Sequence, residues 1–309
     1  MDIEKNLNNN LIIANNNVIN VDEEKPQINN DESDQKTIQS IGQEQQQQQQ
    51  KQHLKRHRQF YAWIKRHLWI FPLILSTLLI ILCIIPYIMS IHYGTVDPLL
   101  PYVSDTGGLS PGSMVFSQII DFIAILIFIT CWIRYKQIKF YLNNNFIGKN
   151  LDYLNRLHRM NRHSFWLMII SGIGAIGVGN IRTTEFYPLH VVNALTVFIS
   201  ACIYACYSTH LARILYREYG IESQPITMMF CAIITSISMV MVLIFESINR
   251  YQVGNEKFEN NNQFRMHWPQ TDKESYYVHV TATTFEWIMI FTFAIFILCL
   301  CRRFRMIGS

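Results

Sequence analysis

The sequence predicts an all-α, polytopic membrane protein with six transmembrane helices and both termini in the cytoplasm. Three observations predict this fold. Long apolar blocks with few charges follow one another after residue 67. Each block has about the 20 residues that a helix needs to cross the hydrocarbon core of a bilayer. Lys and Arg gather in alternate connecting segments, which sets the orientation.

The first 60 residues differ from the rest of the chain. They carry runs of Asn and Gln and almost no aromatic residue. Such a segment buries too little apolar surface to offset its ordering entropy, so we expect a disordered cytoplasmic tail over 1–60. The transmembrane domain then covers 61–305, and 306–309 form a short cytoplasmic tail. The first apolar block should act as an uncleaved anchor, because no apolar h-region precedes it.

Six blocks qualify as membrane spans, and none of them contains more than two charged residues. Helix is the required conformation, because hydrocarbon offers no partner to a free backbone N–H or C=O. A β-barrel would need short segments of alternating polarity, whereas these blocks are continuously apolar. The predicted spans are about 68–91, 113–135, 164–181, 187–210, 225–247 and 281–301.

The distribution of basic residues predicts which side each connection faces. Segments 51–67, 134–163, 212–224 and 302–305 together hold 18 Lys and Arg, and the alternate segments hold five. Because Lys and Arg are retained on the cytoplasmic side, the basic segments and both termini are predicted to be cytoplasmic.

A glycine motif in the third span resembles a nucleotide-binding fingerprint. Residues 172–177 fit G-x-G-x-x-G, but that fingerprint needs a preceding strand and a helix N-terminus to meet a pyrophosphate. Within a membrane helix, packing explains the glycines better. Ser171, Ala175 and Gly179 recur every four residues, so we expect them on one face where a neighbouring helix approaches closely.

We expect no enzymatic activity. The triplet Asp105-Thr106-Gly107 matches the aspartic-protease motif, but that chemistry needs two such carboxylates, and the single copy followed by Gly108 indicates a turn. The sequence contains no H-E-x-x-H zinc motif and no phosphate-binding loop. Accordingly, no cofactor, no metal and no nucleic-acid partner are predicted.

Polar residues recur in the predicted outer half of the membrane. Ionisable groups in lipid are costly and are usually paired, so we expect one polar cluster or cavity. Three interpretations remain open: hydrogen bonds that fix the bundle, a site for a lipid or its headgroup, and a path for an ion or proton. The candidate residues are Asp105, Asp121, Asn180, His190 and Glu286.

Two further surfaces are predicted from their composition. Arg156, Arg159 and Arg162 lie in a basic segment beside the cytoplasmic leaflet. They act either as topogenic charges alone or as a surface for anionic phospholipids or a cytosolic protein partner. On the outer side, the aromatic residues of loop 249–279 favour a position against the headgroups, with a stacking platform for a ligand as the alternative.

Several of these residues together resemble one known family. Leu100-Pro101-Tyr102-Val103-Ser104-Asp105-Thr106-Gly107 and Glu286-Trp287 resemble the loop and the "EW" signature of the damage-regulated autophagy modulator (DRAM)/TMEM150 family, within the Frag/DRAM/Sfk superfamily. Gly179-Asn180 and His190 also match, whereas Gly112 stands where a Glu is common. The resemblance covers residues 68–305.

The resemblance implies a six-span membrane protein without catalytic chemistry. Members of the superfamily are tied to regulation of autophagy at lysosomes, to recruitment of a phosphoinositide kinase at the plasma membrane, or to remodelling of glycolipid-anchored proteins in the Golgi. Our expectation is therefore a lysosomal or endosomal membrane protein, with the plasma membrane or Golgi as alternatives. Membrane lipids, including anionic phospholipids, and a cytosolic protein are the expected partners.

Overall fold

The computed structural model describes residues 66–145, 150–220, 225–254, 261–269 and 273–305. These residues belong to one compact unit. The predicted tails, 1–60 and 306–309, therefore lie outside the described residues. No strand occurs within the described ranges, which confirms the all-α class.

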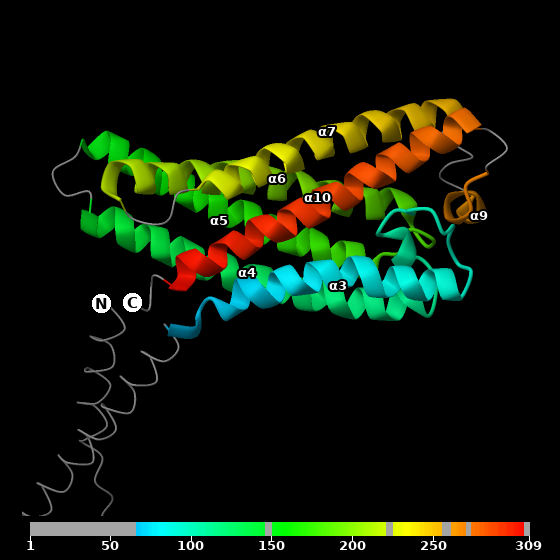
Figure 1. Ribbon diagram of the computed structural model, residues 1–309, viewed down its shortest axis with the longest axis horizontal. Helices are drawn as coiled ribbons and strands as arrows, with labels where there is room; N and C mark the ends of the chain where they lie inside the picture. The colour runs from blue at the N-terminus through cyan, green and yellow to red at the C-terminus, as the bar shows by residue number, and fades with distance from the viewer. Residues whose placement is uncertain (1–65, 146–149, 221–224, 255–260, 270–272, 306–309) are drawn as a thin grey trace, which may run out of the picture. The chain divides into compact units, whose positions relative to one another are not determined.

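Six long, apolar helices confirm the six predicted membrane spans (Figure 1). Each is long enough to cross a bilayer, and a 3₁₀ turn and one short helix occupy the described parts of the connections. The helices are α3 (Ile70–His92), η1 (Asp105–Gly107), α4 (Gly112–Asn145), α5 (Leu151–Asn180), α6 (Tyr187–Tyr219), α7 (Ile226–Val253), α9 (Asn262–Met266) and α10 (Lys273–Arg305).

The long helices form a closed ring. Each packs on the next in the order α3, α4, α5, α6, α7 and α10, and α10 returns to α3. Because successive helices are antiparallel, α3 begins and α10 ends at the same end of the ring (Figure 1). The opposite end, which carries residues 93–111, 181–186 and 261–269, is called the loop end below.

Five of the six helices extend well beyond the predicted spans. Helix α5 begins at Leu151 rather than near residue 164, and the side chain of Asn150 caps it by accepting a hydrogen bond from the Asp152 backbone N–H at 2.9 Å. Apolar blocks mark only the part of a helix in hydrocarbon. The extensions are amphipathic: Leu157, for example, is buried in a small core with residues of α4 and α6, whereas Arg156 is exposed.

The outer surface of the ring is apolar. Every long helix presents large hydrophobic side chains outward, and the examples below are each between 47% and 62% exposed. Soluble monomers rarely expose so much contiguous apolar surface, whereas a bilayer solvates it. The examples are Ile88, Phe122, Ile173, Val192, Phe230 and Ile295.

The glycines of α5 serve helix packing, as predicted, but on two faces rather than one. A Cβ at Gly179 would lie 2.2 Å from the Ile120 side chain of α4. A Cβ at Gly174 would lie 3.1 Å from the Asn193 carbonyl of α6. The Ser171 hydroxyl also donates to the Val197 carbonyl of α6. The small residues of α5 therefore lie on two faces of the helix, one packed against α4 and the other against α6.

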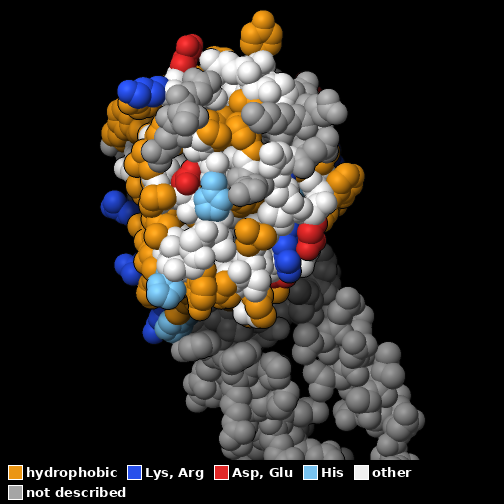
Figure 2. All heavy atoms as spheres, turned by 90° about the vertical axis from the view of Figure 1, so that its right-hand side faces the viewer, with side chains coloured by type: hydrophobic (Ala, Val, Ile, Leu, Met, Phe, Trp, Pro, Cys, Tyr) orange, Lys and Arg blue, Asp and Glu red, His pale blue; other side chains and the backbone are white. Residues whose placement is uncertain are grey.

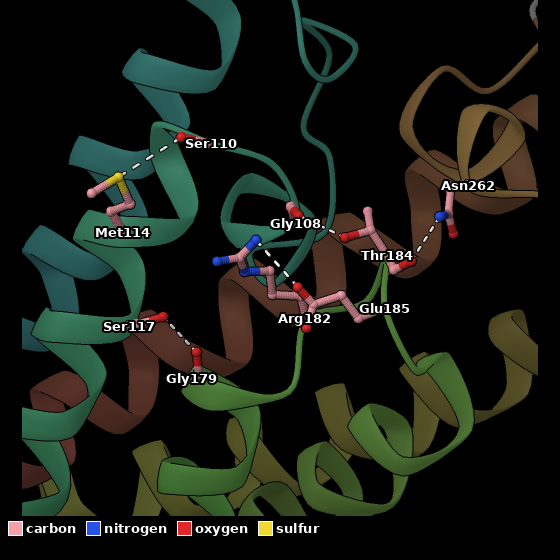
Figure 3. Close-up of polar contacts among 9 residues, drawn as sticks. All are labelled: Gly108, Ser110, Met114, Ser117, Gly179, Arg182, Thr184, Glu185 and Asn262. Carbon is pink, nitrogen blue, oxygen red and sulfur yellow. Dashed lines mark hydrogen bonds and ion pairs between the residues drawn. The ribbon is translucent and has the colours of Figure 1, made fainter.

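Three connections are joined to one another at the loop end (Figure 3). The Thr184 hydroxyl donates to the Gly108 carbonyl, and the Asn262 amide donates to the Thr184 carbonyl, both at 2.7 Å. The Ser117 hydroxyl of α4 donates to the Gly179 carbonyl at 2.6 Å. Figure 2 looks onto this end, where polar side chains and backbone fill much of the face and hydrophobic side chains gather towards its rim.

Substitution of Gly112 by Ala is expected to destabilise the protein by about 2 kcal/mol. A Cβ there would lie 2.6 Å from the Thr106 carbonyl and 2.8 Å from the Ser90 hydroxyl, which hydrogen-bond to each other. Because the carbonyl is backbone, the loop itself must shift. The melting temperature in detergent should fall for Gly112→Ala and stay unchanged for Met114→Leu, since Met114 is 60% exposed. Equal melting temperatures for the two variants would contradict the close contact.

Candidate functional site

The segment before η1 is fastened to α10. The Glu286 carboxylate accepts a hydrogen bond from the Val103 backbone N–H at 2.8 Å. The Trp287 indole N–H donates to the Pro101 carbonyl at 2.9 Å. The Glu-Trp pair of α10 thereby satisfies two backbone groups of a buried loop that has no strand or helix to do so. These two hydrogen bonds hold the family-like loop against α10, and together they are called the clamp below.

A second set of polar contacts joins this segment to α7. The Glu246 carboxylate accepts hydrogen bonds from the hydroxyls of Tyr102 at 2.6 Å and Tyr187 at 3.1 Å. The Arg250 guanidinium lies 3.5 Å from the same carboxylate. The Arg265 guanidinium also lies over the Tyr187 ring, 4.3 Å from the ring centroid. Charge on α7 is therefore balanced locally, as expected for groups near lipid.

Asp105 is the ionisable group of the loop itself. Its side chain is 5% exposed. Burial raises the pKa of Asp105 from 3.8 to about 7, against the opposing effect of Arg265 and with a further rise from Glu246. The carboxyl group is therefore partly protonated near neutral pH, and it can both donate and accept a hydrogen bond.

These groups surround a cavity at the loop end, called the polar chamber below. About 720 Å³ of empty space lies inside it and at its open mouth. Its polar lining comes from two loops and from α6, α7 and α10. The residues that define it are Asp105, Thr183, His190, Glu246, His279 and Glu286.

Two polar atoms of this chamber have no hydrogen-bond partner within the described part of the chain. They are His190 Nε2 and His279 Nδ1, on side chains that are 3% and 6% exposed. Unpaired buried polar atoms are costly, and each therefore calls for a partner in the chamber. Because they come from two separate helices, they point to one shared occupant or to water.

A second cavity continues inward from the polar chamber, and it is called the apolar chamber below. It encloses about 890 Å³ of empty space, counting its mouth, and all six long helices line it. Ser104, Ala194, Phe198 and Glu286 line both cavities. The remainder of its lining is almost entirely hydrophobic. Representative residues are Leu82, Phe116, Ile123, Val197, Met289 and Phe293.

The structure divides the five residues of the expected polar cluster into two groups. Asp105, His190 and Glu286 line the polar chamber together. Asp121 and Asn180 do not: the Asn180 amide donates to the Asp121 carboxylate at 3.1 Å on the exposed side of α4 and α5. That pair joins two helices, so the expectation of one cluster is wrong for Asp121 and Asn180. It agrees there with hydrogen bonds that fix the bundle.

Sequence reasoning missed several residues of the chamber. His279 lies seven residues before Glu286, and this spacing places both on one face of a helix. Thr183 and Arg265 gave no comparable signal, because loop geometry alone brings them there. The headgroup position expected for the aromatic loop is wrong for Trp268, which is 3% exposed. Its ring stacks on His279 with centroids 4.1 Å apart.

The basic residues Arg156, Arg159 and Arg162 lie at the opposite end of the ring. All three side chains are exposed on α5. A spacing of three residues places them along one side of the helix, on the extension that precedes the predicted third span. The arrangement forms a continuous basic strip, called the α5 basic strip below.

Comparison with known proteins identifies the family. Residues 67–307 match the family model described as the Frag1/DRAM/Sfk1/Cwh43P N-terminal domain. The chain belongs to the Frag1/DRAM/Sfk1/Cwh43 family. The match begins just before α3 and ends just after α10, so the family domain is the six-helix ring with its loops.

Relatives in this family are named for autophagy. DNA damage-regulated autophagy modulator protein 2 of Bos taurus is 28% identical over 225 residues, which cover 73% of this chain and 79% of the relative. The Homo sapiens protein 2 is 27% identical over the same shares. Modulator of macroautophagy TMEM150B of Homo sapiens is 25% identical over 47% of this chain and 57% of its own length. No solved structure matches the chain.

Proposed function

We propose that this protein regulates autophagy from a lysosomal or endosomal membrane, and that it does so without catalysing a reaction. The match of the whole ring to a family whose relatives are named autophagy modulators carries the proposal. The similarity supports a multi-pass membrane protein with an autophagy-related role. The lysosomal or endosomal compartment is our choice among the branches of the family.

The geometry of the family-like residues favours a regulator over an enzyme. Glu286, Trp287 and Tyr102 use their polar atoms to hold one loop against α10 and α7. A general acid or base must instead be positioned to reach a reacting group. These family-like polar residues therefore stabilise the loop end. We expect regulation to depend instead on exposed surfaces that can bind other molecules.

We propose that the α5 basic strip is such a binding surface. Three exposed arginines on one side of a helix attract anionic phospholipid by about 1 kcal/mol each. A cytosolic protein with an acidic surface would be attracted by the same charges. The strip thus offers a non-catalytic means to connect the membrane-embedded ring with autophagy components.

The test is rescue of autophagy in cells that lack the gene. The unmodified chain should restore autophagic flux and co-localise with a lysosomal marker. The variant Arg156→Gln, Arg159→Gln, Arg162→Gln should keep that location but restore less than half of the flux, because the attraction is lost. Flux is measured as turnover of a lipidated autophagosome marker with and without lysosomal inhibition.

A charge-preserving variant supplies the control. Arg156→Lys, Arg159→Lys, Arg162→Lys should retain flux if charge alone is recognised. Normal flux in cells that lack the gene would overturn the proposed role. Location at the cell surface or Golgi with flux unaffected would favour the kinase-recruiting or glycolipid-remodelling branches instead. Full rescue by the glutamine variant would remove the strip from the mechanism.

A further inference from the structure

We propose that the two chambers bind one amphipathic lipid with an uncharged, hydroxyl-bearing head, of the sterol or diglyceride class. The apolar body would occupy the apolar chamber, and the hydroxyl would lie in the polar chamber among Thr183, His190 and His279. This inference goes beyond the proposed role in autophagy and does not depend on it.

Continuity of the two cavities gives the ligand its shape. Ala194 and Phe198 of α6 and Glu286 of α10 line both chambers, so the passage between them lies within the ring. The polar chamber is thus continuous with the apolar chamber inside the ring. A ligand that fills both must have a compact polar end and a long apolar body, which is the shape of a lipid rather than of a soluble metabolite.

His190 of α6 indicates that the polar head of the ligand must donate a hydrogen bond. His190 Nδ1 lies 2.6 Å from the Ile181 carbonyl oxygen, which can only accept, so Nδ1 carries a hydrogen. In the neutral ring the buried Nε2 is then an acceptor, and it has no partner among the described residues. A hydroxyl group on the ligand would donate to Nε2. The Thr183 hydroxyl, which hydrogen-bonds to the Asp105 carboxyl, also lines this space.

Charge in the polar chamber favours an uncharged head. Glu246 is matched by Arg250 at 3.5 Å, and Glu286 accepts the Val103 N–H. Arg265 donates to the Thr183 carbonyl at 2.9 Å and lies over the Tyr187 ring. Both guanidinium groups are thus already engaged by groups of the protein, and neither is left to bind a phosphate. An anionic head would have to be desolvated without compensation.

The seam between α6 and α7 provides a route from the bilayer. These two helices pack less closely than any other neighbours in the ring. Besides the polar groups named above, apolar side chains from both helices line the polar chamber: Leu195 and Phe198 of α6, and Met239, Val242 and Leu243 of α7. A lipid could therefore enter sideways without exposing its apolar body to water.

The experiment uses photoactivatable, clickable sterol and diglyceride probes on the full chain in lipid nanodiscs. Labelling by one of the two probes should be saturable, and excess of the matching unlabelled lipid should compete. The arm that labels distinguishes a sterol from a diglyceride. Peptide mapping should place the label on α6, α7 or α10 inside the ring. Equal competition by phosphatidylserine, or labelling by neither probe, would overturn the proposal.

Matched variants test whether the chambers hold the probe. Ala194→Trp fills the passage and should reduce saturable labelling at least tenfold. Val192→Trp adds the same side chain two residues away, where Val192 is 57% exposed on the outer surface, and should label like the unmodified chain. If Ala194→Trp fails to elute as a folded species, His190→Phe removes the acceptor and should weaken labelling at least threefold. Unchanged labelling in the folded variants would refute the proposed site.

Because these measurements use purified protein, their failure is separate from failure of the proposed function. A chain that binds the probe but does not restore autophagic flux would keep the inference and reject the role in autophagy. A chain that restores flux but binds neither probe would do the reverse.

Discussion

The variant Glu286→Ala is expected to lower the stability of the protein by about 3 kcal/mol or more. The Glu286 side chain is 5% exposed and accepts the Val103 backbone N–H. Alanine leaves that N–H buried without a partner and opens a void between the two chambers, which Glu286 lines. Both effects act on the loop that closes the end of the ring. The melting temperature of the purified protein in one detergent should therefore fall by roughly 10 °C.

Glu286→Gln is the control that separates the hydrogen bond from the charge. The glutamine carbonyl has the same reach and can still accept from Val103. We expect its melting temperature to stay within a few degrees of the unmodified protein. If both variants melted alike, the bond to Val103 would contribute little, and the clamp between the loop and α10 would have to rest on Trp287 alone.

The fold was predictable because the strongest constraint on it depends on local amino-acid composition. Hydrocarbon forces helix on any span, so counting apolar residues is enough to find six helices. The same count placed the start of α5 too late, because the stretch from Leu151 alternates buried and exposed residues instead of being uniformly apolar. Amphipathic extensions depend on which helices become neighbours, and composition does not contain that information.

Only part of the candidate site could be predicted from the sequence. Asp105, His190 and Glu286 were found because charged or polar groups near lipid need partners. The same argument wrongly added Asp121, since it gives depth in the membrane but not the direction of a side chain around the helix. The rotation of a helix about its own axis decides whether such a side chain points into the chamber or away from it.

The stability of the protein is expected to fall as pH rises from 5 to 8, because of Asp105. Burial raises the pKa of Asp105 from 3.8 to about 7, so between these values the folded protein holds a proton that the unfolded chain releases. Stabilisation by the neutral carboxyl is complete below about pH 4 and is lost as pH rises through about 7. The change between pH 5 and 8 corresponds to about 3 kcal/mol. Melting temperatures measured across this range in one detergent report it.

Asp105→Asn isolates this contribution, because asparagine stays neutral at every pH while keeping the shape of the carboxyl. The surrounding titratable and charged groups are the same in both proteins, namely Glu246, Glu286, His190, His279 and Arg265. The variant should melt higher than the unmodified protein at pH 8, by a smaller margin at pH 5, and nearly alike below about pH 4. A difference of the opposite sign at pH 8 would mean that attraction to Arg265 outweighs the cost of burying the charge. The loop end, predicted to face away from the cytosol, would then be most stable in a neutral compartment rather than an acidic one.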